Sequence, residues 1–126
     1  MPAMPWRQFG APDPEGDYVA LVSFLPLKSF SRLFPFVIYT VQVILQLANA
    51  DGVAGYSLLA HPLSKQFWTL SAWKNEEALR AFVVKAPHAQ IMTSLRPHMA
   101  GPKFVRWQVK GSQLPLQWDE ALRRIS

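Results

Sequence analysis

The chain has 126 residues, the size of one domain that can bury a core without a metal or a disulfide. Half of its residues are hydrophobic and only 17% are charged, so an excess of apolar side chains needs a core, a cavity or a subunit interface. There is no cysteine, which excludes disulfides and thiolate chemistry. The net charge of +5 comes from scattered Lys and Arg without a basic run, so we expect no nucleic-acid partner.

The N-terminal stretch contains four prolines in its first 16 residues and has no apolar core, so it does not resemble a secretory signal. We predict a flexible Pro-rich N-terminal arm over residues 1–16 and a single ferredoxin-like α+β domain over residues 17–126. A cytoplasmic location is the default expectation for such a chain.

The domain begins with β-forming residues at 17–27 that end in a proline and a leucine, which predicts a strand. Residues 31–49 have helical length and are followed by an Asp-Gly stop signal. Two apolar runs at 53–63 and 66–73, separated by the polar pair Ser64-Lys65, are typical of a β-hairpin.

The predicted helix at 31–49 is apolar over most of its circumference. Gln42, Gln46 and Asn49 form one polar stripe on it, so we expect the helix to have contacts on more than one side. A membrane span needs about 20 predominantly apolar residues, and Pro35 and the polar stripe interrupt this segment. We therefore predict a buried or interface helix and no membrane insertion.

A second helix is predicted after the hairpin, because Asn75 suits an N-cap and two glutamates follow it in the first turn. Pro87 should end or bend this helix, or open a second segment as its first helical residue. Alternating residues at 102–111 predict a last strand, and residues 117–126 a short terminal helix.

The order β-α-β-β-α-β with a C-terminal helix is the ferredoxin-like arrangement with an antiparallel sheet. The strand at 66–73 carries Phe67 and Trp73 on one face and Trp68 and Leu70 on the other, so both faces hold bulky apolar groups. Such a sheet needs cover on both faces. We expect a homodimer in which two sheets face each other, a dimeric α+β barrel.

The residues also resemble a known family. The run FWTLSAWKNEEALRAFVVKAPH, 67–88, resembles the strand-helix-His signature of the dimeric α+β-barrel superfamily, which includes the antibiotic-biosynthesis monooxygenases. An uncharacterised branch is most similar, with a pattern whose positions here are Ser71, Trp73, Glu77, Ala78, Leu79, Phe82 and His88. The C-terminal part resembles that branch too, through Trp107, Gly111 and Pro115. The resemblance implies the same fold and a pocket between the helices and the sheet.

A fainter resemblance links the run GVAGYSLLA, 52–60, with the hairpin after it, to the carotenoid monooxygenases related to spheroidene monooxygenase. That resemblance implies haem. We therefore carry haem, with His88 as axial ligand and Arg96 pairing a propionate, as an alternative to a protein without a cofactor.

His88 is the candidate catalytic residue, because an imidazole titrates near neutrality and can accept or donate a proton. The alternative is a structural role, in which a His beside a proline at a helix break only caps backbone groups. His61 and His98 are turn or loop residues by their setting, and no two histidines have the spacing of a zinc site.

The candidate ligand-binding residues are mostly large aromatic side chains, which suit flat apolar ligands but also build ordinary cores. Arg96 is added because a guanidinium pairs well with an anionic group. The candidates are Trp73, Tyr56, Trp68, Phe24, Phe82, Met92, Arg96 and Trp107.

Phosphate-binding glycine loops, nucleophile motifs and catalytic acid pairs are missing from the sequence, which disfavours hydrolases and nucleotide-dependent enzymes. The leading hypothesis is a dimer that binds a small apolar or aromatic molecule, acting as a cofactor-independent monooxygenase with His88 as base. Haem binding is the second hypothesis, and a non-catalytic ligand-binding or interaction dimer is the third.

Overall fold

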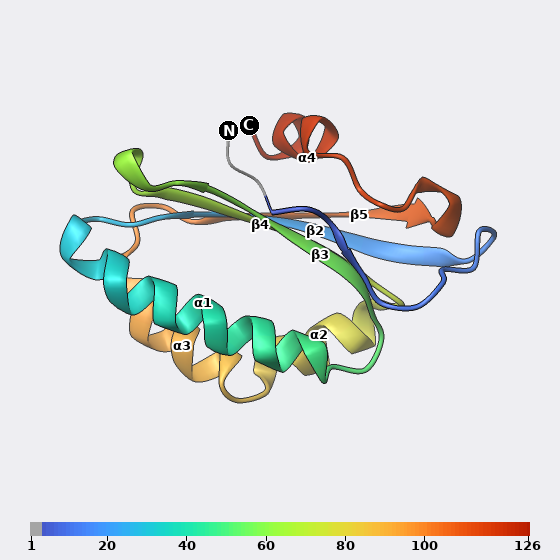
Figure 1. The fold of residues 1–126 in the computed structure, drawn as a ribbon, viewed down its shortest axis with the longest axis horizontal. Coiled ribbons are helices and arrows are strands. Elements are labelled where there is room, and N and C mark those ends of the chain that lie inside the picture. Colours follow the sequence, from blue (N-terminus) through green and yellow to red (C-terminus); the bar gives the residue numbers. More distant parts are fainter. Residues whose placement is uncertain (1–3) are drawn as a thin grey trace.

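The computed structural model describes residues 4–126. Within them one antiparallel sheet has the strand order β1-β3-β4-β2-β5. Helices α1, α2 and α3 cover one face of this sheet, and α4 lies on the other face (Figure 1). The strands are β1 (Arg7–Gln8), β2 (Asp17–Pro26), β3 (Val53–His61), β4 (Gln66–Trp73) and β5 (Lys103–Lys110), and the helices are α1 (Leu33–Ala48), α2 (Glu76–Val84), α3 (His88–Leu95) and α4 (Trp118–Ile125).

The order of β5, β2, β4 and β3 across the sheet confirms the predicted ferredoxin-like α+β fold. Asn75 caps α2 as expected, with its side-chain oxygen 2.8 Å from the Ala78 amide nitrogen. The strand β3 ends at His61, earlier than expected, because Pro62–Ser64 form a 3-10 turn. Pro87 separates α2 from a second helical segment as expected, and it stands at the N-cap of α3, one position before its first residue.

The predicted N-terminal arm contains a short strand. Arg7 and Gln8 of β1 pair with β3, and the Met4 amide donates to the carbonyl of Leu58 at 2.8 Å. The Trp6 ring lies against Gly55, where the backbone of β3 bulges and has no side chain in the way. Residues 1–3 of the predicted arm lie outside the described residues. From Met4 onward, therefore, the first part of the arm adds an edge strand to the sheet.

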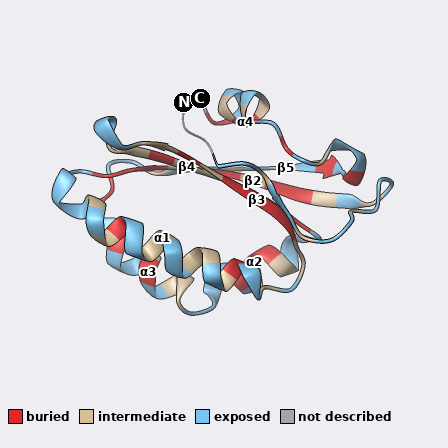
Figure 2. Cartoon of the chain, viewed as in Figure 1, coloured by how far each residue is buried: buried red, intermediate tan, exposed pale blue. Residues whose placement is uncertain are grey.

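Each face of the sheet has its own apolar core. The inner face, toward α1 to α3, carries two clusters around Phe67 and Trp73. The outer face carries a third cluster, in which Ala121 and Ile125 of α4 pack on the centres of β2 and β4. Figure 2 shows the buried residues along both strands. Part of the cover that we expected from a second subunit is thus supplied by the C-terminal helix of the same chain.

The outward side of α1 is not covered by any of residues 4–126. Its exposed residues follow one helical stripe and include Phe34, 73% exposed, and Leu45, 62% exposed; the stripe consists of Phe34, Val37, Ile38, Val41 and Leu45. Phe30, in the 3-10 turn before α1, is exposed as well. Within the described residues α1 contacts the sheet and the α2-α3 junction, and the expectation that its outward side lies at an interface stays a prediction. The segment Phe30–Ala48 is long and apolar enough to cross a membrane by length and composition, a test that core helices of soluble proteins also pass.

The contact between Trp6 and Gly55 allows a test of whether the N-terminal arm packs on β3. A Cβ at Gly55 would lie about 2.5 Å from the indole ring, so we expect Gly55→Ala to displace Trp6 and to lower the free energy of unfolding by about 1–3 kcal/mol. Urea denaturation measures this. In a Trp6→Ala background the same substitution should cost less than about 0.5 kcal/mol, and an equal cost in both backgrounds would contradict the docking of the arm.

Candidate functional site

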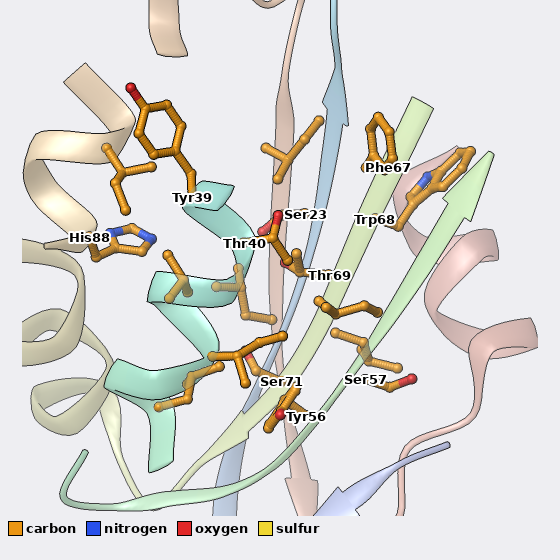
Figure 3. A pocket seen from close by; sticks show the side chains of 18 of the residues that line it. Ser23, Tyr39, Thr40, Tyr56, Ser57, Phe67, Trp68, Thr69, Ser71 and His88 are labelled. Carbon is orange, nitrogen blue, oxygen red and sulfur yellow. The ribbon is translucent and has the colours of Figure 1, made fainter. Parts of the chain in front are cut away.

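A cavity of about 340 Å³ lies between the inner face of the sheet and helices α1, α2 and α3. Its floor comes from the middle of β2, β3 and β4, and α1 forms the opposite wall (Figure 3). Its wall and floor are predominantly aliphatic and aromatic. A pocket of this size and composition is suited to a small apolar molecule.

The lining of the cavity includes no Asp, Glu, Lys or Arg among the residues the structure describes. Its polar side chains are hydroxyls, the indoles of Trp68 and Trp73, and one imidazole. Those whose side chains lie on the helix side are Ser23, Tyr39, Thr40, Tyr56, Thr69, Ser71 and His88. The cavity therefore offers neutral hydrogen-bonding groups and no fixed charge.

The wall α1 is attached near both ends. Toward its N-terminus, Phe36 packs on Phe67 with ring centroids 4.4 Å apart. Toward its C-terminus, Gln46 bonds to the junction of α2 and α3: its Nε2 donates to the carbonyl of Phe82 at 3.3 Å, and its Oε1 accepts from the His88 amide at 3.0 Å. The cavity lies between these two attachments.

His88 is the first residue of α3, and its ring points toward the cavity (Figure 3). Its Nδ1 is 3.1 Å from the carbonyl oxygen of Val83. A carbonyl oxygen only accepts, so this bond requires the proton on Nδ1 and leaves the lone pair on Nε2. Phe82 packs on the ring, with centroids 5.1 Å apart. The backbone carbonyl of Val83 thus supplies the orienting partner that the sequence does not reveal.

Burial lowers the pKa of His88 from its ordinary value near 6.5, and the hydrogen bond to Val83 opposes this in part. The neutral imidazole is therefore favoured at neutral pH. With Nδ1 protonated, that neutral ring can accept a proton at Nε2. This is the state that a general base requires.

Three of the predicted aromatic residues line the cavity together. Trp73 packs on Phe82 with centroids 5.0 Å apart, and its Nε1 donates to the hydroxyl of Ser71 at 2.9 Å. Tyr56 lies opposite Ser71 in the register of β3 and β4, and its ring stacks on Phe9 from the arm. Met92 of α3 also contributes to the wall.

Four other predicted residues are placed elsewhere. Trp68 borders the cavity, but its ring lies on the outer face against Phe24, with centroids 5.2 Å apart. Trp107 is on the outer face as well, beneath the guanidinium of Arg124 at 4.7 Å. Successive strand residues point to opposite faces, so Trp68 and Trp73, five positions apart, cannot share one. Arg96 is exposed beyond α3 and does not line the cavity.

The other two histidines lie outside the cavity. His61 stands at the end of β3 on the outer face, edge-on to Trp68 with centroids 5.3 Å apart. His98 precedes β5, and its carbonyl accepts from the Lys28 amide at 2.8 Å. Both are turn or strand-end residues, as their sequence setting suggests.

Several residues of the site escaped the sequence analysis. Gln46 does not line the cavity but accepts from the His88 amide, and the sequence placed it only in the polar stripe of its helix. Ser23 and Thr69 are small polar residues inside otherwise apolar strands, and they oppose each other in the register of β2 and β4. Their role depends on which face is inward, and that is decided by tertiary packing.

The residues present do not fit haem at this cavity. The propionates of a haem need cationic or exposed surroundings, whereas the lining carries no charge and Arg96 lies outside it. Among residues 4–126 no group of three or more His, Asp or Glu is arranged to hold a metal ion.

Comparison with known proteins supports the fold. The cofactor-independent oxygenase SnoaB from Streptomyces nogalater, in a mutant form, superposes with a TM-score of 0.60 at 16% identity over 78% of this chain and 97% of its own. The fold is that of the antibiotic biosynthesis monooxygenases. A candidate enzyme of this kind from Nitrosomonas europaea gives 0.63 at 19% identity over 74% and 89% of the two chains.

A conserved protein from Methanosarcina mazei Go1 has a TM-score of 0.64 at 13% identity over 71% of this chain and 90% of its own. No protein-family model matches the sequence, and no curated protein matches it. The expected resemblance to the monooxygenase-like α+β-barrel proteins is therefore confirmed at the level of the fold. The haem-associated resemblance receives no support from these structures.

The bridge formed by Gln46 can be tested by substitution. Gln46→Ala removes two hydrogen bonds, so we expect the free energy of unfolding to fall by about 2 kcal/mol. Gln42→Ala, on the same helix but exposed, is the matched control and should change it by less than about 0.5 kcal/mol. Equal effects of the two substitutions in urea denaturation would contradict the bridge.

Proposed function

We propose that this protein binds a flat apolar or aromatic molecule in the cavity between α1 and the sheet and oxidises it as a cofactor-independent monooxygenase. His88 is the general base of the reaction. The observation that carries the proposal is a charge-free apolar cavity with one neutral imidazole at its edge, whose Nε2 is left as acceptor.

Three further points support this function. The burial that lowers the pKa of His88 keeps its ring in the form that can take a proton at neutral pH. SnoaB, which shares the fold, is a cofactor-independent oxygenase. Trp73 and Phe82, which meet at the His88 end of the cavity, supply aromatic surfaces against which a flat ligand can pack.

The chemistry needs no external reductant. For a polycyclic phenol, His88 Nε2 accepts the phenolic proton, and the electron-rich anion transfers electrons to oxygen and forms a carbon-oxygen bond. Loss of water from the resulting hydroperoxide gives a quinone. For 1-naphthol the balance is one molecule of substrate and one of oxygen to one quinone and one water. The apolar walls exclude bulk water from the anion while it reacts.

His88→Gln tests the base. It retains a polar side chain of similar reach but cannot take a proton, and removal of a general base typically costs about 100-fold or more. We expect oxygen uptake with a panel of polycyclic phenols, 1-naphthol included, to fall by that factor in an oxygen electrode. For the native protein the rate should decrease as the pH falls, with a midpoint below 6.5, because protonated His88 cannot act as base.

Far-ultraviolet circular dichroism of both proteins is the control, because it shows whether the His88→Gln protein keeps the native fold. Oxygen uptake that is unchanged in a folded His88→Gln protein would show that His88 is not the base. A native protein that binds the phenols but never consumes oxygen would instead support the non-catalytic binding function.

We also propose that the protein is a homodimer. The outer face is only partly covered by α4, and Phe24, Trp68 and Trp107 stay half-buried there. A second copy placed on this face would complete the burial of these rings. This proposal is independent of the reaction.

Light scattering at micromolar concentration tests the association. We expect a mass of twice 14.3 kDa. Trp68→Lys, which introduces a charge on the outer face, should shift the mass toward 14.3 kDa, whereas Leu63→Lys in the exposed turn after β3 should leave it unchanged. A native mass of 14.3 kDa would contradict the dimer.

A further inference from the structure

The floor of the cavity contains two hydroxyls that make no side-chain hydrogen bond within the described part of the chain, residues 4–126. Ser23 of β2 and Thr69 of β4 are directly opposite in the antiparallel register, so their Cβ atoms are about 5 Å apart. Both line the cavity, and Figure 3 shows them on adjacent strands facing α1. On β2 the polar Ser23 stands between the apolar lining residues Leu21 and Leu25.

Neither hydroxyl makes a side-chain hydrogen bond among residues 4–126, although Ser23 as a whole is only 5% exposed. The other small hydroxyls around the cavity are already bonded. Thr40 donates to the carbonyl of Phe36 at 2.8 Å, and Ser71 accepts from Trp73 at 2.9 Å. The hydroxyl of Ser57 is bonded to Met4 and Trp118 on the outer side.

An unbonded hydroxyl in an apolar setting is unfavourable, and a group that bonds it on binding is correspondingly favoured. The Ser23 and Thr69 hydroxyls are not sealed inside the protein, because both open on the cavity. Each can donate and accept, so the two can hold one oxygen atom of a ligand from two sides.

We propose that Ser23 and Thr69 are the specificity-determining pair of the cavity, and that they select an uncharged ligand carrying one hydroxyl or carbonyl oxygen above the β2-β4 junction. This inference rests on the proposed function, since it requires that the cavity binds a ligand. It goes further by naming the residues that recognise the ligand and the chemical class that they accept.

The charge of the ligand follows from the same lining. No Lys or Arg lines the cavity within residues 4–126, so a carboxylate there would lose its hydration without gaining a counter-charge. Two hydroxyls can donate to such an anion but cannot neutralise it. A phenol or a ring ketone, in contrast, needs only the hydrogen bonds that this pair offers.

Three flat probes of matched size separate the possibilities: 1-naphthol, 1-methylnaphthalene and 1-naphthoate. Their dissociation constants are measured by equilibrium dialysis under nitrogen, so that no oxidation contributes. We expect the native protein to bind 1-naphthol about 10-fold more tightly than 1-methylnaphthalene, and 1-naphthoate most weakly.

The double substitution Ser23→Ala and Thr69→Val removes both hydroxyls with little change in shape. It should abolish the preference for 1-naphthol while leaving the affinity for 1-methylnaphthalene within about 3-fold of the native value. Thr93→Val is the matched control, because that hydroxyl donates to the carbonyl of Ala89 in its own helix at 3.0 Å and does not line the cavity. It should keep the preference.

The outcomes distinguish this inference from the proposed function. A native protein that binds both neutral probes equally, or a double variant that keeps the preference for 1-naphthol, overturns the role of the pair while the cavity still binds ligands. A native protein that binds none of the three overturns both. Tight binding of 1-naphthoate overturns the selection of uncharged ligands.

Discussion

The attachment of α1 at its two ends is the constraint on which the site depends. If the helix packed along its full length, its side chains would fill the space above β2 and β4, as in an ordinary two-layer core. Instead Phe36 meets Phe67 near one end, and Gln46 is bonded to the α2-α3 junction near the other. The cavity and the position of the His88 amide both follow from these contacts.

The junction of α2 and α3 connects this packing to the chemistry. Val83, in the last turn of α2, offers a carbonyl that would otherwise be left over at a helix end, and the His88 ring takes it up. The same His residue donates its amide to Gln46. The break between α2 and α3 therefore fixes the orientation and the tautomer of the His88 imidazole, and it also holds the C-terminal end of α1.

Most of the fold could be predicted from local patterns, because strand alternation, the Asn75 cap and the proline at 87 are physical signals within a few residues. The site was predictable only in part. Trp73, Tyr56 and His88 reach the cavity, whereas Trp68 and Phe24 lie on the opposite face. Strand periodicity could have separated Trp68 from Trp73, but which face lies under the helices is decided by long-range packing. The cover of the outer face by α4 depends on such packing too.

The way α1 is held has a consequence for motion. Its only buried residues are Phe36 and Leu47, and the residues between them that pack toward the sheet, such as Val43 and Ile44, are only partly buried. The free energy of lifting this wall is then smaller than that of unfolding the sheet, where the centres of β2 and β4 are buried on both faces. A molecule can enter through a local opening while the strands stay paired, and the backbone amides of α1 exchange with solvent ahead of those of the sheet.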